Sequence, residues 1–180
     1  MRKCLRHRRC GRTLTNWVSG LVLWMMFSAL AAGGPQLSLK NLDGEWHSID
    51  EFVGRGQWVL VNIWGPRCPP CVEEMPELGS FHDRHSGAGA MVLGIAIDFP
   101  SFGYAVATDV RQFLDDYLID FPVLLADHTV FARLTDGQQL RAVPTSLLYR
   151  PDGVLAVVHT GTLTQLQLEQ YLARQDARFR

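Results

Sequence analysis

Residues 60–76 read LVNIWGPRCPPCVEEMP, and this stretch decides the fold. It opens inside the apolar run 57–64, which is rich in Val, Ile and Trp, as expected of a strand buried on both faces. It closes at the start of segment 72–85, whose apolar side chains recur at helical spacing. Cys68 and Cys71 therefore lie where a buried strand ends and a helix begins.

This junction favours thiolate chemistry. A helix N-terminus offers unpaired N–H groups and a positive dipole end, both of which stabilise a thiolate. If Cys68 is the N-cap, Pro69 and Pro70 take the first two helical positions, where their missing N–H groups cost nothing. Cys68 is then expected to point outward as the attacking thiolate, with Cys71 one turn later as the buried resolving thiol. Arg67 either lowers the pKa of Cys68 or is an ordinary solvated cation.

The rest of the chain alternates strands and helices. A turn at Asp43-Gly44 joins two short alternating segments in a β-hairpin. Periodicity then predicts a strand over 90–98, a helix over 109–118, a strand in 121–127, a helix in 128–134, a β-hairpin with strands near 145–149 and 154–159, and a helix over 164–175. This order predicts an α/β protein whose mixed sheet is covered by helices on both faces.

The first 34 residues form a basic head and an apolar segment. Six of the 17 Lys and Arg lie within the first twelve residues, and segment 17–32 is strongly apolar. Cations stay on the cytoplasmic side, so this segment is expected to insert in the membrane and send the following domain to the periplasm or the extracytoplasmic face. Ala29-Leu30-Ala31 fits a signal-peptide cleavage site, while the uncharged length would also span a bilayer as an anchor.

The part after the head is acidic. It carries 11 basic and 18 acidic side chains, a net charge of about −7. Phosphate recognition depends on clustered Lys and Arg, so no nucleic-acid partner is expected.

Two other roles for the cysteine pair fit less well. A disulfide between Cys68 and Cys71 closes a tiny loop and would restrict the unfolded chain only slightly, so it is a poor staple. A structural zinc needs four ligands, and this pair supplies two. Of the histidines, only His82 and His85 have the spacing of a second ligand pair, and both are expected to face solvent. A peroxidase of the peroxiredoxin kind is disfavoured because the Pro-x-x-x-Thr-x-x-Cys context is absent.

The stretch 60–76 resembles the active-site segment of the thioredoxin superfamily, and most closely the exported thioredoxin-like proteins of the TlpA, ResA and CcmG type. Their pattern is a strand ending in Asn-x-Trp-x-x-x-Cys-Pro-Pro-Cys, followed by a Glu and a Met-Pro. The matching residues are Asn62, Trp64, Cys68, Pro69, Pro70, Cys71, Glu74, Met75 and Pro76. The resemblance covers about residues 36–175. It implies, for residues 35–180, a thioredoxin fold with an N-terminal β-hairpin extension and a short helical insertion.

The resemblance also implies which residues support the cysteines. Val143-Pro144 is expected to be a cis peptide bond that faces the pair and to form, with Trp64, the substrate-binding surface. Asn62 stands where cytoplasmic thioredoxins carry a buried Asp. Because an amide cannot ionise, Glu74 is the expected proton acceptor for the resolving thiol.

One position departs from the family's pattern. Arg67 stands where the family usually has an aromatic residue, which removes part of a flat apolar rim. The range of partners and the potential of the pair are therefore open.

The implied activity is extracytoplasmic thiol–disulfide exchange without a cofactor. The implied partners are protein thiols and disulfides, including the haem-binding cysteines of apocytochromes c, and a membrane electron donor that recycles the pair. DsbA-type oxidants usually hold a large helical insertion, whereas the segment from Asp98 to Asp109 has room for only a short one. Reduction is therefore favoured. A DsbA-like oxidant and a metal-binding protein of the same fold are the alternatives.

Overall fold

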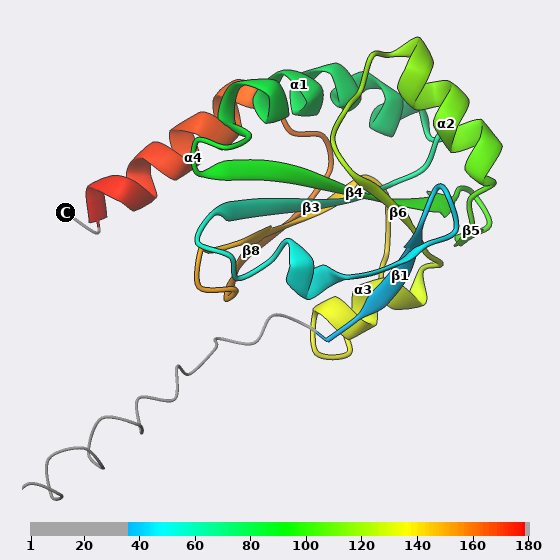
Figure 1. Cartoon of the computed structure of the whole chain (residues 1–180), viewed down its shortest axis with the longest axis horizontal. Coiled ribbons are helices and arrows are strands. Elements are labelled where there is room, and N and C mark those ends of the chain that lie inside the picture. Colours follow the sequence, from blue (N-terminus) through cyan, green and yellow to red (C-terminus); the bar gives the residue numbers. More distant parts are fainter. Residues whose placement is uncertain (1–35, 179–180) are drawn as a thin grey trace, which may run out of the picture. The chain divides into compact units, whose positions relative to one another are not determined.

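The computed structural model describes residues 36–178 (Figure 1). The basic head and the apolar segment 17–32 lie outside these residues, so their assignment as a signal peptide or membrane anchor stays a prediction. In the described part of the chain, no helix has the length and apolar character needed to cross a membrane.

A mixed β-sheet lies at the centre of the domain. Over residues 36–178 its strands run in the order β2-β1-β6-β4-β3-β7-β8, and the short β5 pairs with β4. Strand β4 is parallel to β3 and β6, whereas β7 is antiparallel to β3 and β8. The strands are β1 (Ser38–Asn41), β2 (Trp46–Ser48), β3 (Trp58–Trp64), β4 (Ala90–Asp98), β5 (Gly103–Tyr104), β6 (Val123–Leu125), β7 (Thr145–Tyr149) and β8 (Leu155–Thr160).

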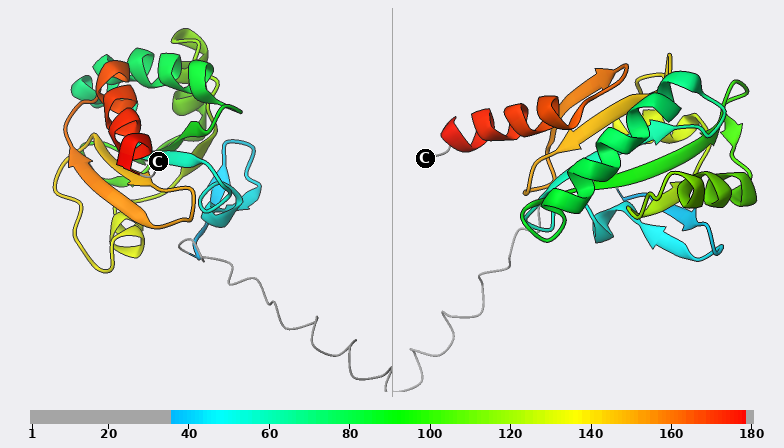
Figure 2. Two further views of the ribbon diagram at one scale, coloured as in Figure 1. Left: turned by 90° about the vertical axis from the view of Figure 1, so that its left-hand side faces the viewer. Right: turned by 90° about the horizontal axis from the view of Figure 1, so that it is seen from above.

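Helices cover both faces of this sheet, as the sequence predicts. They are α1 (Pro69–His85), α2 (Ala107–Asp116), α3 (Thr129–Leu134) and α4 (Gln165–Arg178), with a 3-10 turn η1 at Ile49–Glu51. Figures 1 and 2 show α1, α2 and α4 on one face and α3 on the other. Leu168 of α4 is buried, so α4 closes the core above β7 and β8.

The two central parallel strands set the position of the site. Every residue of β3 is buried, and so is every residue of β4 except Asp98. They pair in parallel from Trp58 opposite Ala90 to Trp64 opposite Ala96. Parallel strands buried on both faces need continuous apolar runs, which is what the sequence supplies. Their carboxyl ends meet at one edge, and α1 begins there.

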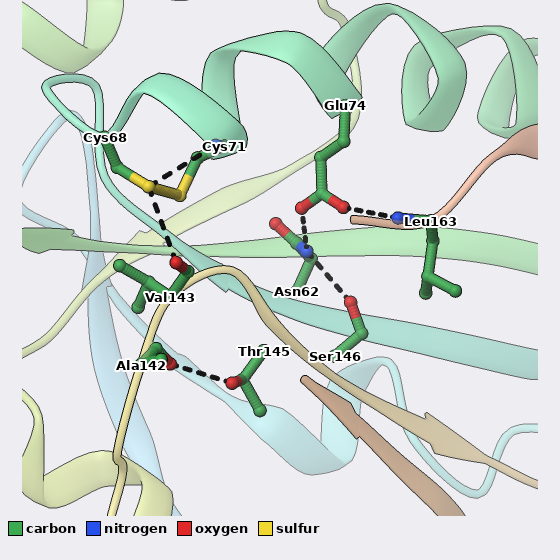
Figure 3. The surroundings of a disulfide bond; sticks show 9 residues. All are labelled: Asn62, Cys68, Cys71, Glu74, Ala142, Val143, Thr145, Ser146 and Leu163. Atoms are coloured by element: carbon green, nitrogen blue, oxygen red, sulfur yellow. Dashed lines mark hydrogen bonds between the residues drawn. A yellow bond between two sulfur atoms is a disulfide. The ribbon is translucent and has the colours of Figure 1, made fainter. Parts of the chain in front are cut away.

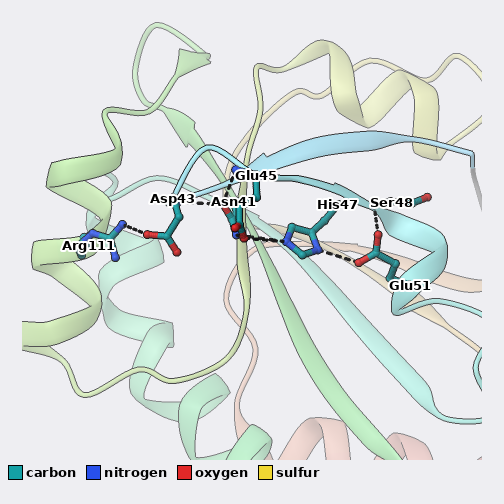
Figure 4. A network of polar contacts seen from close by, with 7 residues as sticks. All are labelled: Asn41, Asp43, Glu45, His47, Ser48, Glu51 and Arg111. Carbon is teal, nitrogen blue, oxygen red and sulfur yellow. Dashed lines mark hydrogen bonds and ion pairs between the residues drawn. The ribbon is translucent and has the colours of Figure 1, made fainter.

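The predicted N-terminal hairpin is present and extends the sheet through β6. Its turn is held by Asn41, whose Oδ1 accepts hydrogen bonds of 2.9 Å from the N–H groups of Asp43 and Glu45 (Figure 4). Gly44 takes the left-handed conformation, with φ of 86°, that this turn requires. Arg111 of α2 donates to the carboxylate of Asp43 at 2.9 Å and ties the hairpin to the helix layer.

The sequence predicts a short helical insertion between Asp98 and Asp109, and the segment between β4 and α2 differs from this prediction. Residues 99–106 hold turns and strand β5, so the first helix of this stretch is α2 itself, starting at Ala107. The peptide bond between Phe99 and Pro100 is cis. This compact segment packs on the active-site loop, since a Cβ on Gly65 would lie 3.1 Å from the Cβ of Phe99.

Gly94, in the middle of β4, has no room for a side chain. A Cβ there would lie 3.0 Å from Nε1 of Trp64 and 3.0 Å from Cγ2 of Val123. We expect Gly94→Ala to lower the free energy of unfolding by about 1–3 kcal/mol, measured by urea denaturation. Gly103→Ala is the control, because its Cβ would meet Oγ of Ser101 at an ordinary 3.6 Å. Equal stability of the two variants would contradict this account of the strand.

Candidate active site

The cysteine pair lies at the first turn of α1, as predicted. Cys68 is the N-cap, Pro69 and Pro70 are the first helical residues, and Cys71 follows. Cys68 and Cys71 form a disulfide with their Cα atoms 5.2 Å apart (Figure 3). The N–H of Cys71 donates to Sγ of Cys68 at 3.3 Å, so the helix N-terminus directs a donor at this sulfur.

The prediction that Cys68 points outward is wrong for the disulfide-bonded protein. Both cysteines are fully buried. Sγ of Cys68 turns back over the first helical turn toward Cys71, and the backbone of Val143 lies across it, with the carbonyl oxygen 3.7 Å from the sulfur. A partner's sulfur therefore has to displace part of this cover to reach Cys68.

The peptide bond between Val143 and Pro144 is cis, which confirms the expectation from the resemblance. Pro144 directly precedes β7, which pairs with β3, so the fold brings the proline loop to the end of the strand that leads into the cysteines. The side chain of Val143 is itself buried. What faces the disulfide is thus backbone, which can pair with an extended peptide.

Trp64 is not part of the substrate-binding surface in this structure, contrary to the prediction. Its side chain is fully buried, and its ring packs on Phe113 of α2 with the centroids 5.0 Å apart. As the last residue of β3 it points into the layer between sheet and helices. Trp64 therefore supports the active-site loop from beneath and offers no surface to a substrate in this state.

Arg67 is exposed and forms an ion pair with Asp98 at the end of β4. Asp98 also accepts a hydrogen bond of 2.8 Å from Oγ of Ser101. The ion pair fastens the active-site loop to the neighbouring strand. It also offsets much of the positive charge of Arg67, whose influence on Cys68 stays a prediction.

Glu74 is buried beneath α1, one turn after Cys71. The residue is only 2% exposed, although it carries a carboxyl group. One carboxylate oxygen accepts a hydrogen bond of 2.8 Å from Nδ2 of Asn62, and the other accepts one of 2.9 Å from the N–H of Leu163 (Figure 3). Glu74 thus links α1 to β3 and to the segment before α4.

This environment shifts the titration of Glu74 toward neutral pH. Burial raises its pKa to about 7, against the lowering effect of the bonds from Leu163 and Asn62. Residues three apart on a helix share a face, so the group lies on the side of α1 that also carries Cys71. The placement and the pKa suit a group that takes a proton from the resolving thiol.

Two members of this network are absent from the predicted site. Ser146 of β7 accepts a hydrogen bond of 2.9 Å from Nδ2 of Asn62, and Leu163 contributes its backbone N–H. Ser146 lies opposite Asn62 in the register of β3 and β7. Only the strand register could have indicated Ser146, and a backbone donor leaves no mark in the sequence.

Of the two helix histidines, His82 differs from the prediction. His82 does not face solvent; it is buried, and its Nδ1 accepts a hydrogen bond of 3.1 Å from the N–H of Val92. Burial lowers the pKa of His82. His85 lies 3.1 Å from the carboxylate of Glu169 on α4. Both therefore join α1 to its neighbours in the fold.

Comparison with known proteins agrees with this geometry. Residues 32–158 match the model of the AhpC/TSA family. The chain belongs to the AhpC/TSA family. Among its relatives, the thiol-disulfide oxidoreductase ResA of Halalkalibacterium halodurans is 29% identical over 147 residues, which cover 80% of this chain and 77% of ResA. The thioredoxin-like protein YneN of Bacillus subtilis is 29% identical over 88% of this chain and 98% of its own.

Solved structures show the same fold for this AhpC/TSA family member. A thiol:disulfide interchange protein of Chlorobium tepidum superposes with a TM-score of 0.66 at 20% identity, over 78% of this chain and 93% of that one. StoA of Bacillus subtilis gives 0.58 at 24% identity, over 76% and 95%. With the thioredoxin fold, the family and the Cys68–Cys71 disulfide in place, the protein is a thiol–disulfide oxidoreductase.

Titration of Glu74 should make stability fall as pH rises. Its pKa is raised from 4.5 when unfolded to about 7 when folded, so its favourable contribution is complete below pH 4.5 and lost as pH passes 7. Relative to Glu74→Gln, the wild type should lose about 3 kcal/mol over this range. Urea denaturation of the oxidised proteins measures this difference. Glu73→Gln, at an exposed position, is the control, and parallel curves for wild type and Glu74→Gln would refute the buried titration.

Proposed function

We propose that the protein reduces disulfides of exported proteins on the extracytoplasmic side of the membrane. The observation that carries this proposal is the Cys68–Cys71 pair at the N-terminus of α1, with a cis peptide bond on one side and a buried carboxyl group of near-neutral pKa on the other. The names of ResA and other thiol-disulfide oxidoreductases among the relatives support the same reaction class.

In the proposed cycle the protein starts in the dithiol form. The Cys68 thiolate attacks a substrate disulfide, forms a mixed disulfide and releases the first substrate sulfur as a thiolate. Cys71 then gives up its proton and attacks Sγ of Cys68. This step forms the Cys68–Cys71 disulfide and releases the second substrate thiolate. The substrate gains two electrons, the cysteine pair loses them, and a dithiol donor from the membrane side must restore the pair.

Each supporting residue has a place in this cycle. The N–H of Cys71 and the dipole of α1 stabilise the Cys68 thiolate. Glu74 accepts the proton of Cys71 and later returns it, because a group with a pKa near 7 can do both at neutral pH. The backbone at Val143 and Pro144 pairs with the extended substrate chain beside Cys68.

Two features favour reduction over oxidation. The segment 99–106 is short and carries β5, where DsbA-type oxidants usually hold a large helical insertion. The ion pair between Arg67 and Asp98 also offsets a cation that would otherwise stabilise the Cys68 thiolate and make the pair more oxidising. Cysteines of apocytochromes c before haem attachment are the substrate class that the resemblance implies. Residues 17–32 are proposed to deliver the domain to the periplasm or to anchor it at the membrane.

Trapping of the mixed disulfide tests the substrate class. In Cys71→Ala the second step is blocked, so partners should accumulate as disulfides on Cys68 in the native envelope and be identified by mass spectrometry. We expect proteins with paired cysteines, apocytochromes c among them. The double variant Cys68→Ala, Cys71→Ala is the control and should trap none.

The reduction potential of the pair decides the direction. A reductase should lie close to thioredoxin, at about −270 mV, and far from DsbA, at about −120 mV. Equilibration with glutathione or dithiothreitol buffers gives the value. A potential near that of DsbA, together with newly secreted proteins in the trap, would contradict the reductase and favour the oxidant.

A further inference from the structure

A row of polar side chains crosses three adjacent strands beneath α1 and α4. Asn62 of β3 lies opposite Ser146 of β7, and Ser146 lies opposite His159 of β8. Residues directly opposite each other in antiparallel strands point to the same face, so the three side chains follow one another across the sheet. Asn62 and Ser146 are buried, and His159 is half-buried near the sheet edge.

The amide of Asn62 is the centre of this row. Its Nδ2 donates to Oε1 of Glu74 at 2.8 Å and to Oγ of Ser146 at 2.9 Å, which uses both of its hydrogens. Among the described residues, its Oδ1 has no hydrogen-bond partner. The position of the amide therefore depends on its two acceptors.

Only one of these two acceptors is permanent. A charged Glu74 accepts from the amide, but a protonated Glu74 loses acceptor capacity at one oxygen. Ser146 is neutral at every pH. It remains an acceptor for Asn62 whether Glu74 is charged or not.

The surroundings of Ser146 leave it free to accept. Ser146 lines a cavity of about 140 Å³ beneath α4, whose walls are mainly apolar but also include the side chains of His159, Gln167 and Arg174. A lone pair of Ser146 receives the N–H of Asn62, which leaves its O–H to turn toward the cavity and the polar side chains on its lining. Asn62 is fully buried, so an unpaired amide hydrogen there would be costly, which strengthens the preference for this arrangement.

We propose that Ser146 is a positioning residue that holds the Asn62 amide in place, so that its N–H keeps donating to Glu74 and makes that carboxyl group easier to ionise. This proposal rests on the proposed function, in which Glu74 takes the proton of Cys71. Ser146 touches no reacting atom in the structure and acts through Asn62 alone.

The charged groups near the network do not hold the Asn62 amide in place, so this role falls to Ser146. From α1 this group is Glu77, from β8 His159, and from α4 Arg174, whereas Cys71 is in the disulfide and carries no charge. Glu77 accepts from the N–H of Gln165, and the ring of His159 lies 3.3 Å from the carbonyl oxygen of Thr162. In the described part of the chain, the hydrogen bonds to Glu74 come from Asn62 and Leu163.

Carboxyl carbon NMR of the oxidised full-length protein tests the proposal by following the titration of Glu74. Loss of part of a hydrogen bond should raise the pKa of Glu74 by about half a pH unit in Ser146→Ala, and by more in Asn62→Ala. In the double variant, Ser146→Ala should add nothing to Asn62→Ala. Ser146→Thr keeps the hydroxyl and should restore the wild-type midpoint.

Matched variants separate positioning from packing. Thr135→Val removes another buried hydroxyl, which donates to the carbonyl of Phe131 at 2.7 Å, and should leave the Glu74 midpoint unchanged. If Ser146→Ala does not fold, Ser146→Val against Ser146→Thr gives the same comparison, because the two differ by a hydroxyl in place of a methyl group.

Two results would overturn the proposal: an unchanged midpoint in Ser146→Ala, or an equal rise on top of Asn62→Ala. A failure of the proposed function would give another set of results. In that case the midpoints shift as expected, while Glu74→Gln leaves the rate of dithiol exchange unchanged.

Discussion

The burial of Glu74 is the constraint on which the site depends. A carboxyl group removed from water is costly unless its oxygens are hydrogen-bonded, so α1, β3 and the segment before α4 must keep the positions that supply Asn62 and Leu163 as donors. The same burial raises the pKa of Glu74 to about 7. The burial of this one carboxyl group thus fixes the relative positions of α1, β3 and the segment before α4. It also yields a group that exchanges protons near neutral pH.

The junction of β3 and α1 places the cysteine pair at the N-terminus of the helix. Parallel pairing with β4 buries β3 completely, so the chain can leave the sheet only at its end, and the two prolines start the helix at once. Cys68 is thereby placed at a helix N-terminus, where a thiolate is stabilised. The antiparallel β7 brings Val143 and Pro144 back to the same place from about 75 residues further along the chain.

Local patterns in the sequence predict much of this arrangement. The apolar runs give β3 and β4, the prolines give the start of α1 at Cys68, and the resemblance gives the cis bond before Pro144. Features that depend on strand register and side-chain packing cannot be predicted from local patterns. The burial of Trp64, the pairing of Arg67 with Asp98 and the acceptor Ser146 each require knowing which strands are neighbours and which residues stand opposite each other.

The most direct test of the central claim is the rate at which Cys71 resolves a mixed disulfide on Cys68, measured in single turnover as a function of pH. With Glu74 as proton acceptor, the wild-type rate should rise with a midpoint near 7. In Glu74→Gln the midpoint should move up toward that of an unaided thiol, and the rate at neutral pH should fall by roughly a hundredfold. Superimposable profiles for the two proteins would contradict the account.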